Sequence, residues 1–209
     1  MEGKEFFSGS GTLSKIAIEK GHYFTTLDNE QKFNPDVCKS ILDEIDKQSY
    51  DFMWFSPPCK TFSVASIGTH WKGGHRAYEP KTKECELGIS LLDKSIRIIS
   101  KSKPKYWFIE NPRGVMRKVI DKIFEKYGVK DYTRHTITYC QYGDTRMKPT
   151  DIWTNCKEWK SRPVCKNGMS CHTKAPRGAK TGTQGLKGSY ERGILPKALC
   201  LEILDFVTK

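Results

Sequence analysis

Two reactive side chains each follow directly after a short apolar run. Cys59 comes after the run 52–55 and a Pro-Pro pair, and Glu110 ends the run 106–109. The diproline stiffens the chain beside Cys59, as a thiolate nucleophile requires, although a lone cysteine there also suits burial as a small apolar residue. Glu110, partly desolvated at a strand end, could share a proton with a substrate, or it could cap a turn.

A glycine-rich segment, Phe7-Ser8-Gly9-Ser10-Gly11, follows the first β-rich run and precedes a helical pattern. Glycines let a backbone approach a ligand closely, and the start of the next helix offers free N–H groups. Asp28 ends the second β-rich run, where a carboxylate can accept hydrogen bonds from ribose hydroxyls. The alternatives are an ordinary tight turn for the glycine segment and a capping or turn role for Asp28.

A fourth polar segment, residues 141–153, places the cations Arg146 and Lys148 in a turn between two predicted strands. A surface hairpin would look much the same. Open α/β sheets, however, bind their ligands at the carboxyl ends of their strands. Polar segments at several strand ends therefore indicate one shared site.

Such a site needs a scaffold, and β-rich and helical runs alternate for about 150 residues, which predicts an α/β fold with a mostly parallel sheet and helices on both faces. The most regular helical period covers 115–127 and ends at Gly128. The predicted strands are Lys4–Phe7, Tyr23–Leu27, Phe52–Phe55, Tyr106–Ile109, His135–Tyr142 and Asp151–Thr154. The other predicted helices are Leu13–Lys20, Pro35–Leu42, Glu84–Ser102 and Pro196–Val207.

The net charge of +12 is concentrated in two segments. Residues 60–83 carry five basic residues against one acidic, and residues 157–197 carry ten against two. Clustered positive charge favours a polyanion such as DNA or RNA as partner, although a generally basic soluble protein would have the same total. Residues 60–83 also contain three glycines and show no period, which predicts a long, mobile, functional loop.

The sequence contains no apolar run as long as a signal peptide or a membrane-spanning helix, so we expect an intracellular protein without a membrane partner: cytoplasmic, or in the host cell if a phage encodes it. Eight cysteines then indicate thiolate chemistry, metal binding or buried thiols. The Gly- and Lys-rich segment 155–192 can bury little apolar area, and a zinc ion would give it a fold. The candidate ligands are Cys156, Cys165, Cys171 and His172, and the alternative is unpaired thiols.

In chain order, Phe-x-Gly-x-Gly, Pro-Pro-Cys, Glu-Asn-Pro and Gln-Tyr-Gly…Arg…Lys-Pro-Thr resemble the motifs of the DNA cytosine-5 methyltransferases. Residues 193–196 are similar to the last motif of that family, and compact phage-type members look closest, which suggests DNA methylation in a restriction-modification setting. The resemblance implies a Rossmann-like S-adenosylmethionine-dependent methyltransferase fold. It also implies a catalytic domain over 1–154, a reduced target-recognition segment over 155–192, and a C-terminal helix over 193–209 that returns to the catalytic domain.

The resemblance further implies that Cys59 attacks carbon 6 of a flipped-out cytosine while Glu110 holds its exocyclic amine and N3. S-adenosylmethionine would lie across the glycine segment, with Asp28 at its ribose and Asp43 near its adenine, and the loop 60–83 would close over the extruded base. The implied cofactor-binding residues are Phe7, Ser8, Gly9, Ser10, Gly11, Thr12, Leu13, Asp28, Asn29, Asp43 and Pro57.

The fourth segment departs from the Gln-x-Arg-x-Arg pattern of larger family members. Lys148 falls at the place of the arginine that contacts the cytosine oxygen and the cysteine, with Arg146 as its rival, so both stay candidates. One branch of the family acts on transfer RNA with the same motifs, which leaves RNA as the alternative substrate. A non-catalytic nucleic-acid-binding protein on the same fold is the alternative of another class.

Overall fold

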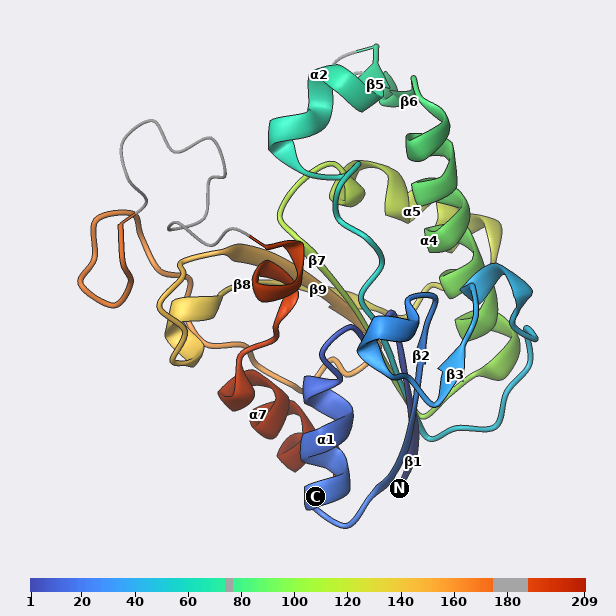
Figure 1. The fold of residues 1–209 in the computed structure, drawn as a ribbon, viewed down its shortest axis with the longest axis vertical. Coiled ribbons are helices and arrows are strands. Elements are labelled where there is room, and N and C mark those ends of the chain that lie inside the picture. Colours follow the sequence, from blue (N-terminus) through green and yellow to red (C-terminus); the bar gives the residue numbers. More distant parts are fainter. Residues whose placement is uncertain (74–76, 175–187) are drawn as a thin grey trace.

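The computed structural model describes residues 1–73, 77–174 and 188–209. Its central strands are β1 (Glu2–Phe6), β2 (Tyr23–Asp28), β3 (Val37–Cys38), β4 (Phe52–Phe55), β7 (Tyr106–Pro112), β8 (Thr133–Thr138) and β9 (Pro149–Thr154). They form one sheet in the order β3-β2-β1-β4-β7-β9-β8 (Figure 1). Pairing is parallel from β3 to β7, whereas β9 runs antiparallel to both β7 and β8.

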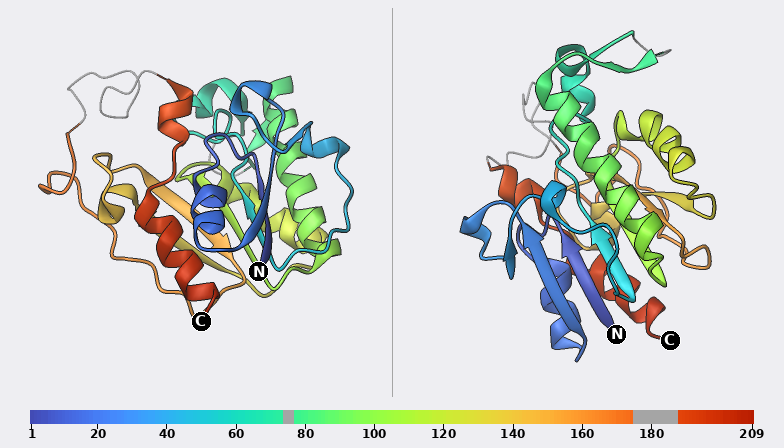
Figure 2. Two further views of the ribbon diagram at one scale, coloured as in Figure 1. Left: turned by 60° about the horizontal axis from the view of Figure 1, so that its bottom comes forward. Right: turned by 90° about the vertical axis from the view of Figure 1, so that its right-hand side faces the viewer.

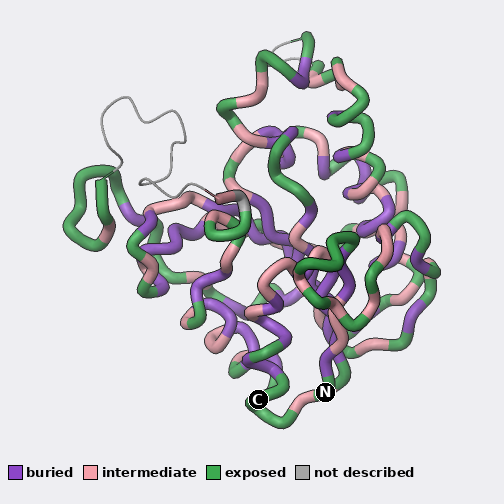
Figure 3. Tube along the Cα trace, in the orientation of Figure 1, coloured by how far each residue is buried: buried purple, intermediate pink, exposed green. Residues whose placement is uncertain are grey.

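Helices cover both faces of this sheet, as predicted (Figure 2). The covering helices are α1 (Thr12–Glu19) and α7 (Lys197–Val207) on one face, and α4 (Lys83–Ser102) and α5 (Met116–Lys126) on the other. Strand β4 shows why both faces are apolar: Phe52 and Trp54 pack with α1 and α7, while Met53 and Phe55 pack with α4 and α5. All four side chains are fully buried, and Figure 3 shows the same burial along the central strands. A buried parallel strand reads as a continuous apolar run for this reason.

The helix predicted at Pro35–Leu42 is wrong. Strand β3 and the 3-10 turn η2 (Ile41–Asp43) occupy this part of the chain. The carboxylate of Asp36 accepts hydrogen bonds from the N–H and the hydroxyl of Thr26, each at 2.8 Å. These bonds fasten the segment to the edge of β2, so it adds a short strand to the sheet.

Residues 60–83 contain regular structure where the sequence predicted a loop without any. The described parts form η3 (Val64–Ser66), α2 (Ile67–His70) and a hairpin of β5 (Trp71–Lys72) and β6 (Glu79–Pro80), placed beyond one end of α4 in Figure 1. Trp71 is buried, its ring centroid lies 6.0 Å from that of Phe62, and its indole N–H donates to the Thr61 carbonyl at 2.6 Å. Phe62 and Trp71, two buried aromatic residues whose spacing fits neither a helix nor a strand, hold this segment against the core. Arg76, one of its five basic residues, lies outside the described residues.

The strand predicted at His135–Tyr142 ends earlier, at Thr138. Residues Tyr139–Tyr142 instead form the 3-10 turn η4, followed by Gly143 at a φ of 80°. The N–H of Tyr139 donates to the Met147 carbonyl at 2.9 Å, which turns the chain back toward β9. The turn η4 therefore stands at the edge of the sheet where β9 begins.

Glu5, in the middle of β1, is a buried acid that the sequence did not single out. Its carboxylate accepts hydrogen bonds from the N–H and the hydroxyl of Ser14, at 2.9 and 2.6 Å, beneath the first turn of α1. Burial raises the pKa of Glu5 from 4.5 to about 7. The folded protein therefore keeps a proton that the unfolded chain has released, so stability falls as the pH rises from 4.5 to 7.

Substitution of Glu5 by glutamine is expected to remove this fall in stability with rising pH. The free energy of unfolding of the variant should rise relative to wild type by on the order of 3 kcal/mol between pH 4 and pH 8, because the amide does not titrate. Urea unfolding at several pH values measures the slope, and Glu2→Gln, at an exposed position of the same strand, is the control. Equal slopes for wild type and Glu5→Gln would contradict the prediction.

Candidate active site

Three of the predicted site residues, Cys59, Glu110 and Lys148, lie at the same edge of the sheet. Cys59 follows the carboxyl end of β4, and Glu110 lies near the carboxyl end of β7, which pairs with β4 in parallel. Lys148 directly precedes β9, whose start faces the end of β7 because these two strands are antiparallel. The topology thus brings together residues from three separate sequence motifs.

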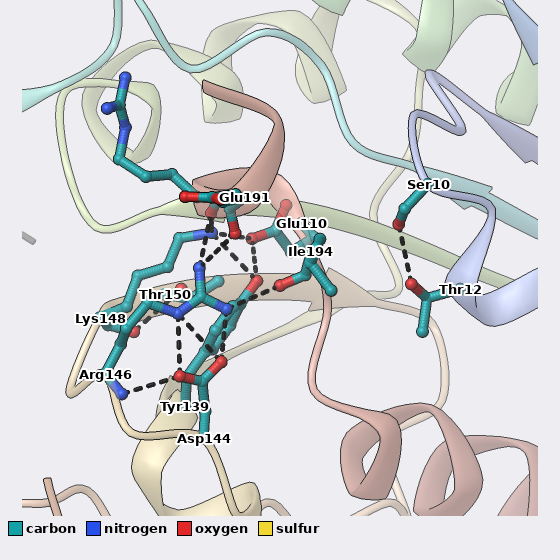
Figure 4. Close-up of polar contacts among 11 residues, drawn as sticks. Ser10, Thr12, Glu110, Tyr139, Asp144, Arg146, Lys148, Thr150, Glu191 and Ile194 are labelled. Atoms are coloured by element: carbon teal, nitrogen blue, oxygen red, sulfur yellow. Dashed lines mark hydrogen bonds and ion pairs between the residues drawn. The ribbon is translucent and has the colours of Figure 1, made fainter. Parts of the chain in front are cut away.

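The carboxylate of Glu110 is buried and held by two neighbours (Figure 4). The hydroxyl of Tyr139, from η4, donates to its Oε1 at 2.8 Å, and Nζ of Lys148 lies 3.9 Å from the same oxygen. Burial and the Glu110 charge raise the pKa of Tyr139 well above its usual value, so the phenol stays neutral and donates. Tyr139 was missed from the sequence because a strand was expected to continue through it.

Lys148 is a partly buried cation whose charge acts on both Glu110 and Cys59. Its Nζ donates to the Arg192 carbonyl at 2.8 Å and to the Tyr139 hydroxyl at 3.3 Å. Burial lowers the pKa of Lys148, and the charges of Glu110 and Cys59 act in the opposite direction. The backbone of Lys148 has a φ of 25°, an uncommon conformation for a residue with a side chain.

Cys59 is exposed as a residue, yet desolvation of its thiol by the surrounding protein raises the pKa of that thiol. The charge of Lys148 lowers this pKa and that of Glu110 raises it. The Cys59 carbonyl accepts from the N–H groups of Phe62 and Ser63, each at 3.0 Å, which starts a tight turn after the thiol. Lys148 is thus the group whose charge most favours the reactive form of Cys59.

Arg146 leaves the same turn as Lys148, and its guanidinium lies between Asp144 and the C-terminal segment (Figure 4). The buried guanidinium forms an ion pair with the partly buried Asp144 carboxylate. The remaining N–H groups donate to three carbonyls of the C-terminal segment, those of Glu191, Arg192 and Ile194. Arg146 therefore holds residues 191–194 beside the site, and its donors are engaged in that contact.

Asn111, which the sequence did not single out, ties the two strand ends together. Its Nδ2 donates to the carbonyl of Pro57 at 2.8 Å, and its side chain is fully buried. Pro57 lies two residues before Cys59, so this bond fixes the path of the chain into the thiol. This bond forms because β4 and β7 are neighbours in the sheet. The Glu-Asn-Pro motif places Asn111 after Glu110 in the sequence but does not show this contact.

Substitution of Asn111 by alanine is expected to lower kcat and to destabilise the fold by about 1–3 kcal/mol, because the buried Pro57 carbonyl loses its donor. Asn155→Ala is a matched control, since the Asn155 side chain bonds the backbone at the opposite end of β7, accepting from Trp107 at 3.0 Å. Steady-state kinetics and thermal unfolding of both variants distinguish positioning of Cys59 from general support of β7. A similar fall in kcat for the two would contradict a positioning role.

The glycine segment forms a turn with left-handed backbone at Phe7, Gly9 and Gly11, whose φ values are 57°, 48° and 61°. The N–H of Gly9 donates to Oδ2 of Asp28 at 2.9 Å, and Oδ1 of Asp28 accepts from Glu30 at 3.0 Å. Asp28 thus has the turn role in this structure, while each oxygen keeps a further lone pair for a ligand. A Cβ placed on Gly9 would meet nothing within 4 Å. An open glycine turn beside an acidic strand end fits S-adenosylmethionine.

The other predicted cofactor residues lie around this turn in different environments. Ser10 and Thr12 share a hydrogen bond of 2.8 Å between their hydroxyls. The side chain of Leu13, in α1, is buried in the core that α1 shares with α7. Asn29 directly follows β2 and Asp43 lies in η2, and both are exposed. Pro57 is buried.

Three of the four predicted metal ligands lie close together, but the fourth, Cys156, lies elsewhere and Cys140 takes its place. Among the residues that the structure describes, Cys165, Cys171 and His172 cluster with Cys140, from η4. Cys156 lies instead in the core beneath α7, and its N–H donates to the Thr154 hydroxyl at 3.0 Å. Sequence proximity favoured Cys156, but the turn at η4 carries Cys140 to the cluster from another part of the chain.

The fold and the strand-end site define a Rossmann-like methyltransferase. Comparison with known families narrows this class, because the model for C-5 cytosine-specific DNA methylases matches residues 20–140, which include Cys59 and Glu110. The chain belongs to this family of cytosine-5 methyltransferases, which use S-adenosylmethionine. A Frog virus 3 (isolate Goorha) protein assigned as a DNA (cytosine-5)-methyltransferase is 26% identical over 218 residues, covering 96% of this chain and 97% of the viral protein.

A solved structure shows the same fold at low identity. An E. coli prophage protein assigned as a DNA modification methyltransferase matches with a TM-score of 0.52 and 18% identity, over 74% of this chain and 46% of that one. The S. pombe Dnmt2 methyltransferase matches with a TM-score of 0.49 and 14% identity, over 76% and 51%. The chain therefore spans about half the length of these solved relatives. No helix within the described ranges is long and apolar enough to cross a bilayer.

Proposed function

We propose that this protein transfers a methyl group from S-adenosylmethionine to carbon 5 of cytosine in DNA, through a covalent adduct with Cys59. The observation that carries the proposal is the partly buried Lys148 ammonium, 3.9 Å from the Glu110 carboxylate and close enough to Cys59 to favour its thiolate. A thiol, a carboxylate and a cation at one sheet edge are the groups that addition to a cytosine ring requires.

The chemistry explains why each group is needed. Carbon 5 of cytosine becomes nucleophilic when the Cys59 sulfur bonds to carbon 6 and the ring electrons shift toward carbon 5. Glu110 contacts N3 and the exocyclic amine, and Lys148 contacts the carbonyl oxygen on carbon 2, to which negative charge spreads in the adduct. S-adenosylmethionine, when bound, would supply the electrophilic methyl group, with S-adenosylhomocysteine as the leaving group. After transfer, a base removes the carbon 5 proton, the double bond reforms and the Cys59 thiolate leaves.

Lys148 takes the place of the family arginine in this proposal, and Arg146 has a positioning role. The support is the direction of the two side chains: Nζ of Lys148 faces Glu110, whereas the guanidinium of Arg146 is occupied by Asp144 and three carbonyls. A primary ammonium can still donate to the cytosine oxygen, although without the bidentate geometry of arginine.

DNA is the proposed substrate because the viral relative is named for DNA and because basic residues flank the site. The segment 60–83 follows Cys59 and is proposed to close over the extruded base, and 155–192 is proposed to contact the target sequence. Part of the charge in 60–83 is paired within the protein, since Lys60 lies 2.7 Å from Glu84 and Lys72 lies 3.6 Å from Glu79. In 157–197, Lys157 and Arg162 are paired too, with Asp131 at 3.0 Å and Glu202 at 2.7 Å. The larger number of basic residues in 157–197 is therefore the basis for proposing it as the main attraction for a nucleic acid.

A direct assay tests the substrate. The full chain is incubated with methyl-labelled S-adenosylmethionine and either duplex DNA or transfer RNA, and 5-methylcytosine is quantified after digestion. Label is expected in DNA and is expected to be lost in Glu110→Gln. Label confined to RNA would replace DNA by the alternative substrate, and label in neither would overturn the enzymatic proposal.

A further inference from the structure

Four metal-ligating atoms converge outside the proposed catalytic site. The sulfurs of Cys140, Cys165 and Cys171 and a ring nitrogen of His172 all lie within 4.8 Å of one another. The Sγ of Cys171 is 3.7 Å from that of Cys140, and Nδ1 of His172 is 3.5 Å from the Cys165 sulfur and 3.6 Å from the Cys171 sulfur. The Cys165 and Cys171 sulfurs are 3.0 Å apart.

These separations resemble the edges of a tetrahedral zinc site. Zinc–sulfur bonds of about 2.3 Å and zinc–nitrogen bonds of about 2.0–2.1 Å imply ligand separations of about 3.5–3.8 Å. Three of the four measured separations fall in this range, and the fourth, between Cys165 and Cys171, is shorter. Three cysteines and one histidine are also an established ligand set for structural zinc.

The segment that carries three of these ligands has almost no core of its own. From residue 160 to residue 174, Cys165 is the only buried side chain, and Val164 and Met169 are about half exposed. Hydrophobic burial therefore contributes little to holding this stretch in one conformation. A small segment of this kind commonly owes its fold to a bound metal.

Polar contacts already bring the segment against η4, where the fourth ligand lies. The N–H of Cys165 donates to the Thr138 hydroxyl at 2.9 Å, and the N–H of Thr173 donates to the Thr145 carbonyl at 2.8 Å. The side-chain amide of Gln141 also donates to the Cys171 sulfur at 3.5 Å. Hydrogen bonds to ligand atoms of this kind orient the ligands of metal sites.

We propose that Cys140, Cys165, Cys171 and His172 bind one zinc ion that fastens residues 160–174 to η4. All four positions are protein ligands, so the ion is structural and leaves no open position for catalysis. Cys140 directly follows Tyr139, whose hydroxyl holds Glu110. The ion therefore joins the segment proposed to contact nucleic acid to the wall of the catalytic site.

Metal content tests the site independently of methyl transfer. Elemental analysis of the purified wild-type chain is expected to give about one zinc per molecule. Cys140→Ser is expected to lose most of it, whereas Cys156→Ser keeps it, because Cys156 is a buried cysteine outside the cluster. Equal zinc in wild type and Cys140→Ser, or loss in Cys156→Ser alone, would overturn the ligand assignment.

A spectroscopic test does not depend on variants that fold. Zinc is removed from the wild-type chain with a chelator under reducing conditions, and Co²⁺ is added. Thiolate-to-cobalt charge transfer and the strong visible bands of tetrahedral Co²⁺ are expected at a one-to-one ratio. Trypsin is expected to cut after the exposed Lys166 more readily in the stripped protein than in the zinc-bound one. No zinc in wild type together with no cobalt bands, or a Cys165–Cys171 disulfide found by mass spectrometry, would overturn the proposal.

Discussion

Replacement of Cys59 by serine is expected to abolish both methyl transfer and covalent capture of DNA that contains 5-fluorocytosine. A serine hydroxyl is far less acidic than a thiol, so it does not supply the anion that attacks carbon 6. In the wild-type protein, the fluorine on carbon 5 cannot leave as a proton does, and the Cys59–DNA bond persists. A denaturing gel with labelled DNA and S-adenosylmethionine measures the adduct.

Cys38→Ser is the matched control for this experiment, since Cys38 is another exposed cysteine and lies in the short strand β3. It should form the adduct as wild type does. An equal yield of adduct from Cys59→Ser would show that another residue is the nucleophile. Capture of fluorinated RNA in place of DNA would leave the role of Cys59 intact and change the substrate.

Lys148 and Arg146 are expected to respond to substitution in different ways. Lys148→Met should lower kcat by about 10²–10³-fold, the usual effect of removing one donor to a developing oxyanion. Arg146→Met should instead lower the free energy of unfolding by about 3–5 kcal/mol, because it removes a buried guanidinium and leaves the partly buried Asp144 carboxylate without its partner. Steady-state kinetics and denaturant unfolding of both variants measure the two effects.

The pH dependence of kcat adds a readout that simple loss of packing would not change. Lys148 lowers the pKa of Cys59, so removal of its charge should move the rise of activity to higher pH. Residual activity of Lys148→Met is therefore expected to increase with pH more than that of wild type. If Arg146→Met folded normally but lost turnover while Lys148→Met stayed active, the two assignments would be exchanged.

The position of the main site could be predicted from sequence because its residues end apolar runs. Parallel strands place their carboxyl ends on one edge, so Cys59 and Glu110 had to lie near each other once the runs were recognised as neighbouring strands. The glycine segment and Asp28 likewise follow the ends of two neighbouring parallel strands, β1 and β2, so they also had to lie near each other. The segment 60–83 was harder, because two aromatic anchors, Phe62 and Trp71, leave no period in the sequence.

The sequence by itself determined the α/β class and the family motifs, Cys59 and Glu110 among them, because these depend on local runs and on residue type. Only the tertiary structure shows that Lys148 faces Glu110 while Arg146 pairs with Asp144, and that Cys140, not Cys156, lies with Cys165, Cys171 and His172. These arrangements depend on where the chain turns after β8 and on how antiparallel β9 returns beside β7. Hydrogen bonds between distant segments set that path, and such bonds leave no periodic signal in the sequence.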